Sequence, residues 1–174
     1  MTISDEYRKQ QMELHENPNY GMASVQYAPL VAQLLEKSGA KTVADYGAGK
    51  CHLRNALHEL GHKNFEYFPY DPAFPDYGKP KPAELVCCID VLEHIEPEFL
   101  ESVLNDLAKI TRHAGFFTIH MGPAVKTLPD GRNAHLIQQP TSWWLPKLCE
   151  RFEIVQLQQA TGGFWVIVTP RMTA

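Results

Sequence analysis

The sequence lacks the features that mark several large classes of protein. Its 174 residues contain four cysteines and no Cys-x-x-Cys pair, so a zinc site is not expected and buried free thiols are the simpler interpretation. Lys and Arg total 16 against 20 Asp and Glu, which gives a formal net charge of −4. Because non-specific nucleic-acid binding relies on many Lys and Arg contacts, this balance does not favour a nucleic-acid partner, although it allows a local basic patch.

Long hydrophobic runs and targeting signals are absent as well. The apolar runs around Val86 and Val166 are far shorter than the stretch of about 20 residues that spans a bilayer. The first six residues lack the basic start and the apolar core of a signal peptide. We therefore expect no membrane partner and a cytoplasmic location. With 44% hydrophobic and 21% charged residues, one globular domain over residues 1–174 is the simplest organisation.

Two common nucleotide-binding motifs are also missing. No Gly-x-x-x-x-Gly-Lys-Ser/Thr element occurs, so a phosphate-cradling NTPase site has no support. A nicotinamide or flavin site requires Gly-x-Gly-x-x-Gly, and His52 stands where the third glycine would be. A different small-molecule site must therefore explain the glycines that are present.

Those glycines belong to the stretch from Lys41 to Leu53. An apolar run ends at Asp45, two glycines one residue apart follow, and an amphipathic segment comes next, which predicts a strand, a tight turn and a helix. Gly47 and Gly49 allow the backbone to approach a ligand where a Cβ atom would clash. The helix N-terminus offers free N–H groups to a carboxylate or phosphate. We expect a small-molecule site at this turn.

Extended and helical patterns alternate along the rest of the chain. We expect strands over 42–46, 65–70, 84–90, 116–121, 152–157 and 164–169. We expect a helix over 4–16 and a second helix that has Pro29 in its first turn and ends at Gly39. A third helix should carry Leu53, Ala56, Leu57 and Leu60 on one face. Two more helices should begin at Pro97 and at Thr141 or Ser142. This alternation is typical of an α/β fold with a mostly parallel sheet. The last two strands should form an antiparallel hairpin near Gly162 and Gly163.

An acidic residue follows the second expected strand. Asp71 lies about twenty positions beyond the glycine turn, where nucleoside-binding folds place the carboxylate that holds ribose hydroxyls. Asp71 and Pro72 therefore indicate a ribose-bearing ligand. The segment 73–82 is too rich in proline for a helix or a central strand, so we expect a loop before strand 84–90, which is apolar throughout and should be central.

Three segments together resemble a known family. Asp45-Tyr46-Gly47-Ala48-Gly49, Tyr70-Asp71-Pro72 and Asp90-Val91-Leu92-Glu93-His94-Ile95 resemble the motifs of the class I S-adenosylmethionine-dependent methyltransferases, over about residues 42–121. The resemblance implies a Rossmann-like, doubly wound core over 39–174 behind an N-terminal helical segment over 1–38. It also implies S-adenosylmethionine as the cofactor. The residues that it places at the cofactor are Asp45, Tyr46, Gly47, Gly49, Asp71, Pro72, Asp90, Val91 and Leu92.

Within that set, the resemblance implies separate tasks. Gly47 and Gly49 approach the methionyl part of the cofactor, and Asp45 helps to position its amino end. Asp71 accepts hydrogen bonds from the ribose hydroxyls, and residues 90–92 lie near the sulfonium.

The sequence departs from the family pattern at two points. Cys51 stands where the family often has a third glycine. Only the proline-rich loop separates Asp71 from the central strand, which leaves no room for the usual helix and third strand. We therefore expect a small variant with a trimmed sheet edge, in which Phe74, Pro75 or Tyr77 supplies the adenine contact.

Candidate catalytic residues follow the central strand and lie in the loop 122–140. His94 can accept a proton from a substrate hydroxyl as the methyl group moves, because its unperturbed pKa lies near neutrality. We name His94, Glu93 and His135 as catalytic candidates. Asp90, Glu93, His94 and His135 also resemble the ligand set of metal-dependent small-RNA 2′-O-methyltransferases, but the rest of that signature is missing, so we assign no metal.

The same loop holds the candidates for binding the methyl acceptor. Arg132 can hold a carboxylate or phosphate with its planar guanidinium group, and Asn133 can recognise a hydroxyl or an amide. Lys126 and His135 complete the expected substrate-binding set. A hydrogen-bonding network that only stabilises the loop is the competing interpretation.

Missing motifs narrow the chemistry further. The chain has no Asn/Asp-Pro-Pro-Tyr/Phe after its central strand and no Pro-Cys nucleophile, which leaves oxygen methylation of a small or sugar-like hydroxyl compound. Two alternatives stay open: an RNA ribose 2′-O-methyltransferase, and a methyltransferase-like binding or scaffold protein without catalysis. The oligomeric state is left open.

Overall fold

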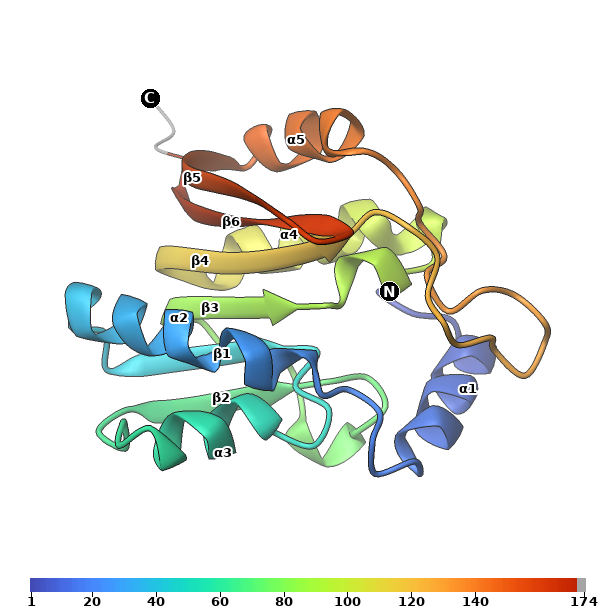
Figure 1. Ribbon diagram of the computed structural model, residues 1–174, viewed down its shortest axis with the longest axis horizontal. Coiled ribbons are helices and arrows are strands. Elements are labelled where there is room, and N and C mark those ends of the chain that lie inside the picture. Colours follow the sequence, from blue (N-terminus) through green and yellow to red (C-terminus); the bar gives the residue numbers. More distant parts are fainter. Residues whose placement is uncertain (172–174) are drawn as a thin grey trace.

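The computed structural model describes residues 1–171, and a six-stranded sheet forms its centre (Figure 1). The strands are β1 (Thr42–Tyr46), β2 (Glu66–Tyr70), β3 (Ala83–Ile89), β4 (Thr111–His120), β5 (Phe152–Ala160) and β6 (Gly163–Pro170). They lie in the order β2-β1-β3-β4-β6-β5. Strands β2, β1, β3 and β4 are parallel, whereas β6 runs antiparallel to both β4 and β5. The predicted Rossmann-like fold with a C-terminal antiparallel hairpin is confirmed.

Helices cover both faces of the sheet. On one face lie α2 (Ala23–Ser38) and α3 (His52–Glu59), and on the other lie α4 (Leu100–Ile110) and α5 (Thr141–Cys149) (Figure 1). Neighbouring residues of β3 alternate between the two cores: Cys87 packs with the α2–α3 cluster and Cys88 with the α4–α5 cluster. Since β3 is buried on both faces, its apolar run correctly indicated a central strand.

Two boundaries on the α2–α3 face differ from those expected. Helix α2 begins at Ala23, so Pro29 lies inside the helix and not in its first turn. Proline lacks the N–H that would bond to the carbonyl of Val25, and the helix accommodates that loss while Ala28, Val31 and Leu35 bury the rest of the face. In α3, Leu53, Ala56 and Leu57 are buried as expected. Leu60 follows the helix at the C-cap position and is 49% exposed.

Strand β4 begins five residues earlier than expected. It follows α4 directly, and Thr111 pairs with Ala83 before a register shift restores regular pairing at Ala114. Arg112 and His113 are exposed, so the first part of the strand carries no apolar alternation that sequence reasoning can detect. Neighbouring strand β3 supplies the pairing that makes this segment extended.

The sheet edge at β2 is trimmed, as the short loop predicted. Residues 71–82 are all described, and they contain a single 3-10 turn (Pro75–Tyr77) and no strand. Strand β2 is therefore an edge strand. Pro69 lies within it, and a proline is tolerated at an edge because the missing N–H takes no partner there.

Helix α1 (Asp5–His15) lies apart from the two helical layers. It packs beside the loop that follows β4, across from the carboxyl ends of the parallel strands (Figure 1). Tyr7, Leu128 and Ala134 form a small buried cluster between this helix and the loop. Within residues 1–171, no helix combines the length and the apolar character that a membrane span requires.

Candidate active site

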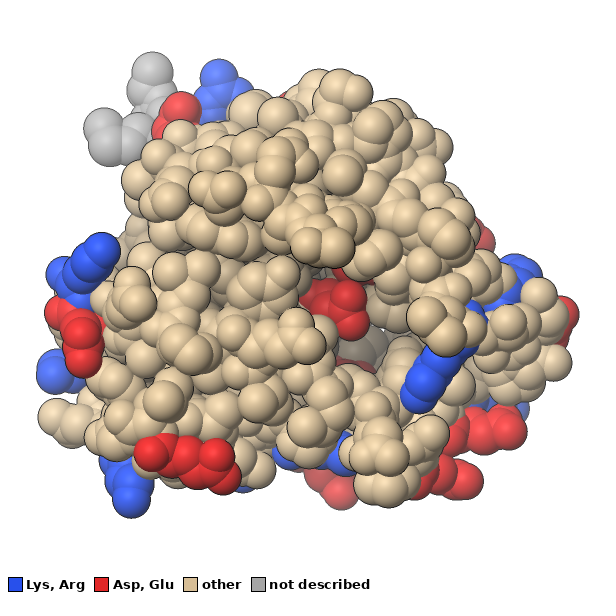
Figure 2. Space-filling model, viewed as in Figure 1, with Lys and Arg blue, Asp and Glu red and all other residues tan. Residues whose placement is uncertain are grey.

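A cavity of about 390 Å³ opens at the carboxyl ends of β1, β2 and β3. Its size lies within the range of roughly 300–1,000 Å³ that is typical of small-molecule sites. The strand-end side is lined by Asp45, Gly47, Gly49, Asp71, Asp90 and Val91, and the outer side by residues of α1, of the α1–α2 turn and of the loop after β4. In Figure 2 this region is hollowed, with acidic side chains inside and a basic side chain at the rim.

The glycine turn after β1 is required by its own packing. Gly47 has φ +83, and a Cβ placed on it would lie 2.3 Å from Cγ2 of Val91. Gly49 has φ +48, and its Cβ would lie 2.9 Å from Cε1 of His15. Both backbone conformations favour glycine. The turn therefore brings the backbone against Val91 and His15, at the floor and the outer side of the cavity.

Asp71 holds the turn through backbone hydrogen bonds. Its Oδ2 accepts from the Gly49 N–H at 3.0 Å, and its Oδ1 accepts from the Ala73 N–H at 2.8 Å. Burial raises the pKa of Asp71, and the two backbone N–H groups partly offset that rise. An ionised carboxylate can accept about four hydrogen bonds, so each oxygen retains capacity for a ligand hydroxyl.

Asp45 is a buried carboxyl group at the end of β1. The Tyr67 hydroxyl donates a hydrogen bond to its Oδ2. Burial raises the pKa of Asp45 to about 7; the Tyr67 hydrogen bond lowers it, and the nearby Asp71 charge adds to the rise. A cationic ligand group would favour the ionised form of this carboxyl.

The end of β3 places Asp90 and Val91 at the floor of the cavity. Asp90 has φ +58, an uncommon conformation for a residue other than glycine, and its N–H donates to the Thr118 hydroxyl at 2.9 Å. This conformation turns the chain out of the strand, so the Asp90 carboxyl comes within 3.9 Å of Nε2 of His94.

Three residues expected at the cofactor do not line this cavity. Tyr46 is 2% exposed and packs beside Tyr70 in the α4 core, and Leu92 is fully buried in the same core. Pro75 lines a second groove, at the trimmed edge. Strand alternation accounts for Tyr46, because it turns the side chain that follows Asp45 to the opposite face.

Phe74 and Tyr77 also lie outside the lining and support the glycine turn. The Tyr77 hydroxyl donates to the carbonyl of Gly49 at 2.8 Å, and Phe74 packs edge-on against His15. Apolar side chains that do line the cavity include Ile3, Pro72, Val91 and Ile95.

Two histidines converge on Asp90 from different segments. Nδ1 of His94 contacts the Ala134 carbonyl at 2.8 Å, and Nδ1 of His135 contacts the Gly122 carbonyl at 2.7 Å. A carbonyl can only accept, so each Nδ1 carries a proton. Nε2 of His94 then faces the Asp90 carboxyl, and Nε2 of His135 is the ring nitrogen that remains for a ligand. The rings pack edge to face with centroids 4.7 Å apart. One ligand atom each from Asp90, His94 and His135 lies within 4.8 Å of the others.

The two histidines differ in how readily they are protonated. Burial lowers the pKa of His94, but the Asp90 and Glu93 carboxylates outweigh burial and raise it overall. Burial lowers the pKa of His135, and the His94 charge adds to the decrease. His135 is therefore the better proton acceptor at neutral pH, because its Nε2 carries a lone pair there.

Glu93 lies behind the histidines and does not line the cavity. It is 0% exposed; its Oε1 accepts from the His120 N–H at 2.6 Å, and its Oε2 has no hydrogen-bond partner within the described residues. Burial and the charge of Asp90 raise the pKa of Glu93 to about 8. Its position favours an indirect role through the loop after β4.

The loop 122–140 separates into lining and supporting residues. Lys126 and His135, two of the predicted substrate-binding residues, line the cavity. Arg132 pairs with Asp130 at 2.7 Å on the exposed side of the loop. Asn133 accepts from the N–H groups of Ala124 and His135 and donates to the Ala124 carbonyl, so its amide is used within the loop. Arg132 and Asn133 therefore fit the competing interpretation of a stabilising network.

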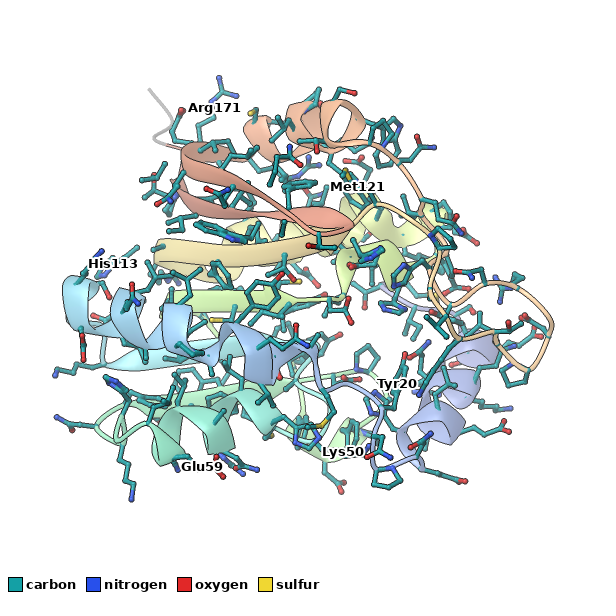
Figure 3. The ribbon with its side chains drawn as sticks, viewed as in Figure 1. Tyr20, Lys50, Glu59, His113, Met121 and Arg171 are labelled. Carbon is teal, nitrogen blue, oxygen red and sulfur yellow. The ribbon has the colours of Figure 1, made fainter. Side chains whose placement is uncertain are left out.

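Sequence reasoning missed the contribution of the N-terminal segment. Tyr7, Gln11 and His15 line the cavity, and so does Tyr20, which lies in the cleft between α1 and the sheet (Figure 3). The spacing of four residues between Tyr7, Gln11 and His15 was a detectable signal, since it places the three side chains on one face of a helix. Nothing in the sequence showed which part of the protein that face would contact.

Comparisons with known proteins agree with this architecture. No family model matches the sequence, and a search of the curated proteins gives no match. Among solved structures, a Burkholderia thailandensis 1,6-didemethyltoxoflavin-N1-methyltransferase with bound 1,6-didemethyltoxoflavin and S-adenosylhomocysteine is similar over 100% of this chain and 92% of its own, with a TM-score of 0.64 and 17% identity. The N-methyltransferase NodS from Bradyrhizobium japonicum, in complex with S-adenosylhomocysteine, is similar over 97% of this chain and 100% of its own, with a TM-score of 0.62 and 10% identity.

A third similar structure is the human N-acetylserotonin methyltransferase in complex with S-adenosylmethionine. It has a TM-score of 0.57 and 13% identity over 97% of this chain and 57% of its own, so this chain spans a little over half of that protein. These likenesses show that the chain has the fold of the class I S-adenosylmethionine-dependent methyltransferases.

Proposed function

We propose that the protein is an S-adenosylmethionine-dependent methyltransferase that transfers the methyl group to a hydroxyl oxygen of a small molecule. One observation carries this proposal. The cavity lies at the carboxyl ends of β1, β2 and β3, where the strand order reverses, and Asp45, the glycine turn, Asp71 and Asp90 all line it. Open α/β sheets bind their ligands at such a reversal point.

The charges on the strand-end side of the cavity suit the cofactor. S-Adenosylmethionine carries a sulfonium and an ammonium group, and the carboxyl groups of Asp90 and Asp45 lie at the floor of the cavity. Asp71 retains acceptor capacity for the ribose hydroxyls after its two backbone hydrogen bonds. The solved methyltransferases that share this fold and hold S-adenosylhomocysteine support this assignment.

The transfer itself needs few protein groups. When bound, S-adenosylmethionine would supply the methyl group to the acceptor oxygen and would leave as S-adenosylhomocysteine. The hydroxyl proton passes to Nε2 of His135, the histidine whose pKa is lowered. The remaining rate acceleration comes from positioning of the two reactants and from exclusion of water by α1.

Binding of S-adenosylhomocysteine, measured by isothermal titration calorimetry, tests the cofactor assignment. Asp71→Asn should weaken binding about ten- to a hundredfold, because hydrogen bonds to a charged group are lost. Glu59→Gln, an exposed carboxyl on α3, is the matched control and should bind as the unmodified protein does. If the unmodified protein binds neither S-adenosylmethionine nor S-adenosylhomocysteine, the methyltransferase proposal is wrong and a binding or scaffold role replaces it.

A second candidate function is methylation of an RNA ribose 2′-hydroxyl with the help of a divalent metal ion. The convergence of Asp90, His94 and His135 favours it, because two imidazoles held by backbone carbonyls and one carboxylate are a common donor set for transition metals. The unpartnered, buried Oε2 of Glu93 also fits a site that gains a positive charge. When bound, such an ion would lower the pKa of the acceptor hydroxyl.

Metal binding can be measured without an acceptor. Chelator-treated protein titrated with Mn²⁺ and followed by electron paramagnetic resonance should bind one ion if the second candidate is right, and Asp90→Asn should abolish that binding. Glu98→Gln, exposed in the 3-10 turn (Pro97–Phe99) just before α4, is the control. Equal Mn²⁺ binding by the Asp90 variant and the unmodified protein would reject the metal, and RNA binding without a steep salt dependence would reject the nucleic-acid substrate.

A further inference from the structure

Three side chains from separate segments meet on the outer side of the cavity. Gln11 comes from α1, Tyr20 from the turn between α1 and α2, and Lys126 from the loop after β4, and all three line the cavity. The Tyr20 hydroxyl donates to Oε1 of Gln11 at 3.2 Å. The Lys126 ammonium lies 4.5 Å from the centroid of the Tyr20 ring. We call these three residues the Tyr20 cluster.

The Tyr20 cluster offers donors that the protein itself does not use. Nε2 of Gln11 is buried and has no hydrogen-bond partner among residues 1–171. No carboxylate in that part of the chain lies within 4.0 Å of the Lys126 ammonium. A buried amide donor without a partner lowers the stability of the folded protein. Such a donor in a cavity wall therefore marks a place where a ligand atom can accept its hydrogen bond.

The cluster differs in charge from the strand-end side. Asp45, Asp71 and Asp90 line the strand-end side, whereas the outer side brings a lysine into the same cavity. Figure 3 shows Tyr20 in the cleft between α1 and the strand ends, and Figure 2 shows a basic side chain beside the acidic hollow. A cation therefore suits the strand ends and an anion suits the Tyr20 cluster.

The fixed orientation of the cluster defines what it can bind. Because Tyr20 donates to Oε1 of Gln11, the amide is oriented with its N–H₂ group free. Tyr7, one helical turn before Gln11, donates its hydroxyl to the His94 carbonyl at 2.7 Å and is also occupied. The free groups are thus an amide N–H and an ammonium, both donors, and they match an anionic oxygen group.

We propose that the Tyr20 cluster binds an anionic oxygen group, a carboxylate or a phosphate, on the methyl acceptor, so that the acceptor is a hydroxyl compound that also carries an acid group. This proposal rests on the proposed function and names its substrate class. The acid group would lie at Gln11 and Lys126 while the hydroxyl faces His135. The cofactor's own carboxylate is the competing occupant of the same donors.

The first experiment separates the two occupants. S-Adenosylhomocysteine binding is measured by calorimetry for Lys126→Met and Gln11→Glu, beside the controls Lys9→Met on the exposed side of α1 and Gln156→Glu on the exposed edge of β5. All four variants should bind it within about twofold of the unmodified protein. A tenfold or larger loss in both cluster variants, with the controls unchanged, assigns the donors to the cofactor and overturns the proposal.

The second experiment tests the acid group with the protein saturated with S-adenosylhomocysteine. Nuclear magnetic resonance measures binding of 4-hydroxybenzoate against 4-hydroxybenzyl alcohol, and of glycerol 3-phosphate against glycerol. The acidic member of at least one pair should bind about tenfold more tightly, and the pair that responds identifies carboxylate or phosphate. Lys126→Met should remove the preference and Lys9→Met should keep it.

Two results of that experiment would overturn the proposal. One is equal binding, or no binding, of the acidic and neutral members of both pairs by the unmodified protein. The other is a preference that survives in Lys126→Met. Failure of the proposed function is recognised separately, because unmodified protein that does not bind S-adenosylhomocysteine cannot be saturated with it. Thermal melts of all four variants show whether a lost preference comes from lost folding.

Discussion

The two sides of the cavity are built in different ways. The strand-end side is held by backbone geometry: two glycines with positive φ, and an aspartate that accepts backbone N–H groups from the glycine turn and from Ala73. The outer side is held by side-chain contacts between distant segments. Ser4 donates to Glu96, Tyr7 to the His94 carbonyl and Gln10 to Asp130.

This difference predicts different stabilities. The strand-end side belongs to the buried sheet and should open only with global unfolding. The outer side depends on a few contacts of α1, so it should open locally at a lower free energy. A cleft with one fixed side and one movable side can hold a cofactor while it admits and releases an acceptor.

The largest effect should come from Gly47→Ala. Its Cβ would lie 2.3 Å from Cγ2 of Val91, in a backbone conformation with φ +83. We expect the free energy of unfolding to fall by about 2–5 kcal/mol, from conformational strain and overpacking together, with loss of cofactor binding. Denaturant unfolding and calorimetry measure both.

Gly131→Ala is the matched control for that change. Gly131 also has a positive φ, of +89, but a Cβ there meets no atom within 4 Å. It should show the strain alone, about 1–2 kcal/mol, and bind the cofactor normally. Equal destabilisation by the two substitutions would mean that the Gly47–Val91 contact does not shape the site.

A smaller effect, and one that depends on pH, should come from Asp45→Asn. The folded-state pKa of about 7 is above the value of roughly 3.9 expected for the unfolded chain, so the folded protein binds more protons at Asp45 between these values. The contribution of Asp45 to the free energy of unfolding is therefore fully present below about pH 3.9, is lost as the pH rises to about 7, and then levels off. The asparagine variant loses this dependence.

The comparison is made on ligand-free protein by thermal melts at several pH values. At pH 8 the variant should be more stable by on the order of 1–3 kcal/mol, and at pH 4 the two proteins should be alike. Glu93 contributes similarly in both proteins and cancels in the difference, whereas the difference includes the loss of the charge repulsion between Asp45 and Asp71. A constant difference between pH 4 and pH 8 would show that Asp45 is not a buried, neutral carboxyl.

The smallest effect should come from Ser4→Ala, which tests the outer side. The Ser4 hydroxyl accepts from the Tyr7 N–H at 3.1 Å and donates to Oε1 of Glu96 at 2.6 Å, so it both caps α1 and fastens it. We expect a loss of about 1 kcal/mol, confined to α1. Hydrogen exchange followed by mass spectrometry should show faster exchange over residues 5–15 and unchanged exchange in β1 and β3.

Ser38→Ala is the control for that experiment. The Ser38 hydroxyl accepts from the Ala40 N–H at 3.3 Å, a local contact at the end of α2. It should leave the exchange of α1 unchanged. If Ser4→Ala speeds exchange in the sheet as much as in α1, the two sides of the cavity form one cooperative unit and the contrast between them is wrong.

The same contrast explains how much could be predicted from the sequence. The strand-end side was foreseen because each of its elements is a short local pattern: a strand followed by Gly47 and Gly49, an acidic residue after the next strand, and Asp90 after an apolar run. Parallel strands bring these patterns to one edge without further information. The strand missing after Asp71 was also predicted, because a proline-rich loop of that length leaves no room for it.

The outer side could not be predicted, because its positions are set by contacts between distant segments. The helical spacing of Tyr7, Gln11 and His15 is visible in the sequence, but the docking of α1 depends on Glu96 and on the His94 carbonyl. Arg132 and Asn133 were expected at the acceptor because of their residue types. Their side chains instead pair with Asp130 and with Ala124, contacts that composition does not reveal.

A crystal structure of the protein with S-adenosylhomocysteine tests the central claim most directly. We predict that the ligand lies across the carboxyl ends of β1, β2 and β3, with its ribose hydroxyls within hydrogen-bonding distance of Asp71 and its sulfur beside Asp90. Gln11 and Lys126 should remain free of it. A ligand bound elsewhere, or a cavity filled by the protein's own side chains around Gly47 and Asp71, would contradict the account.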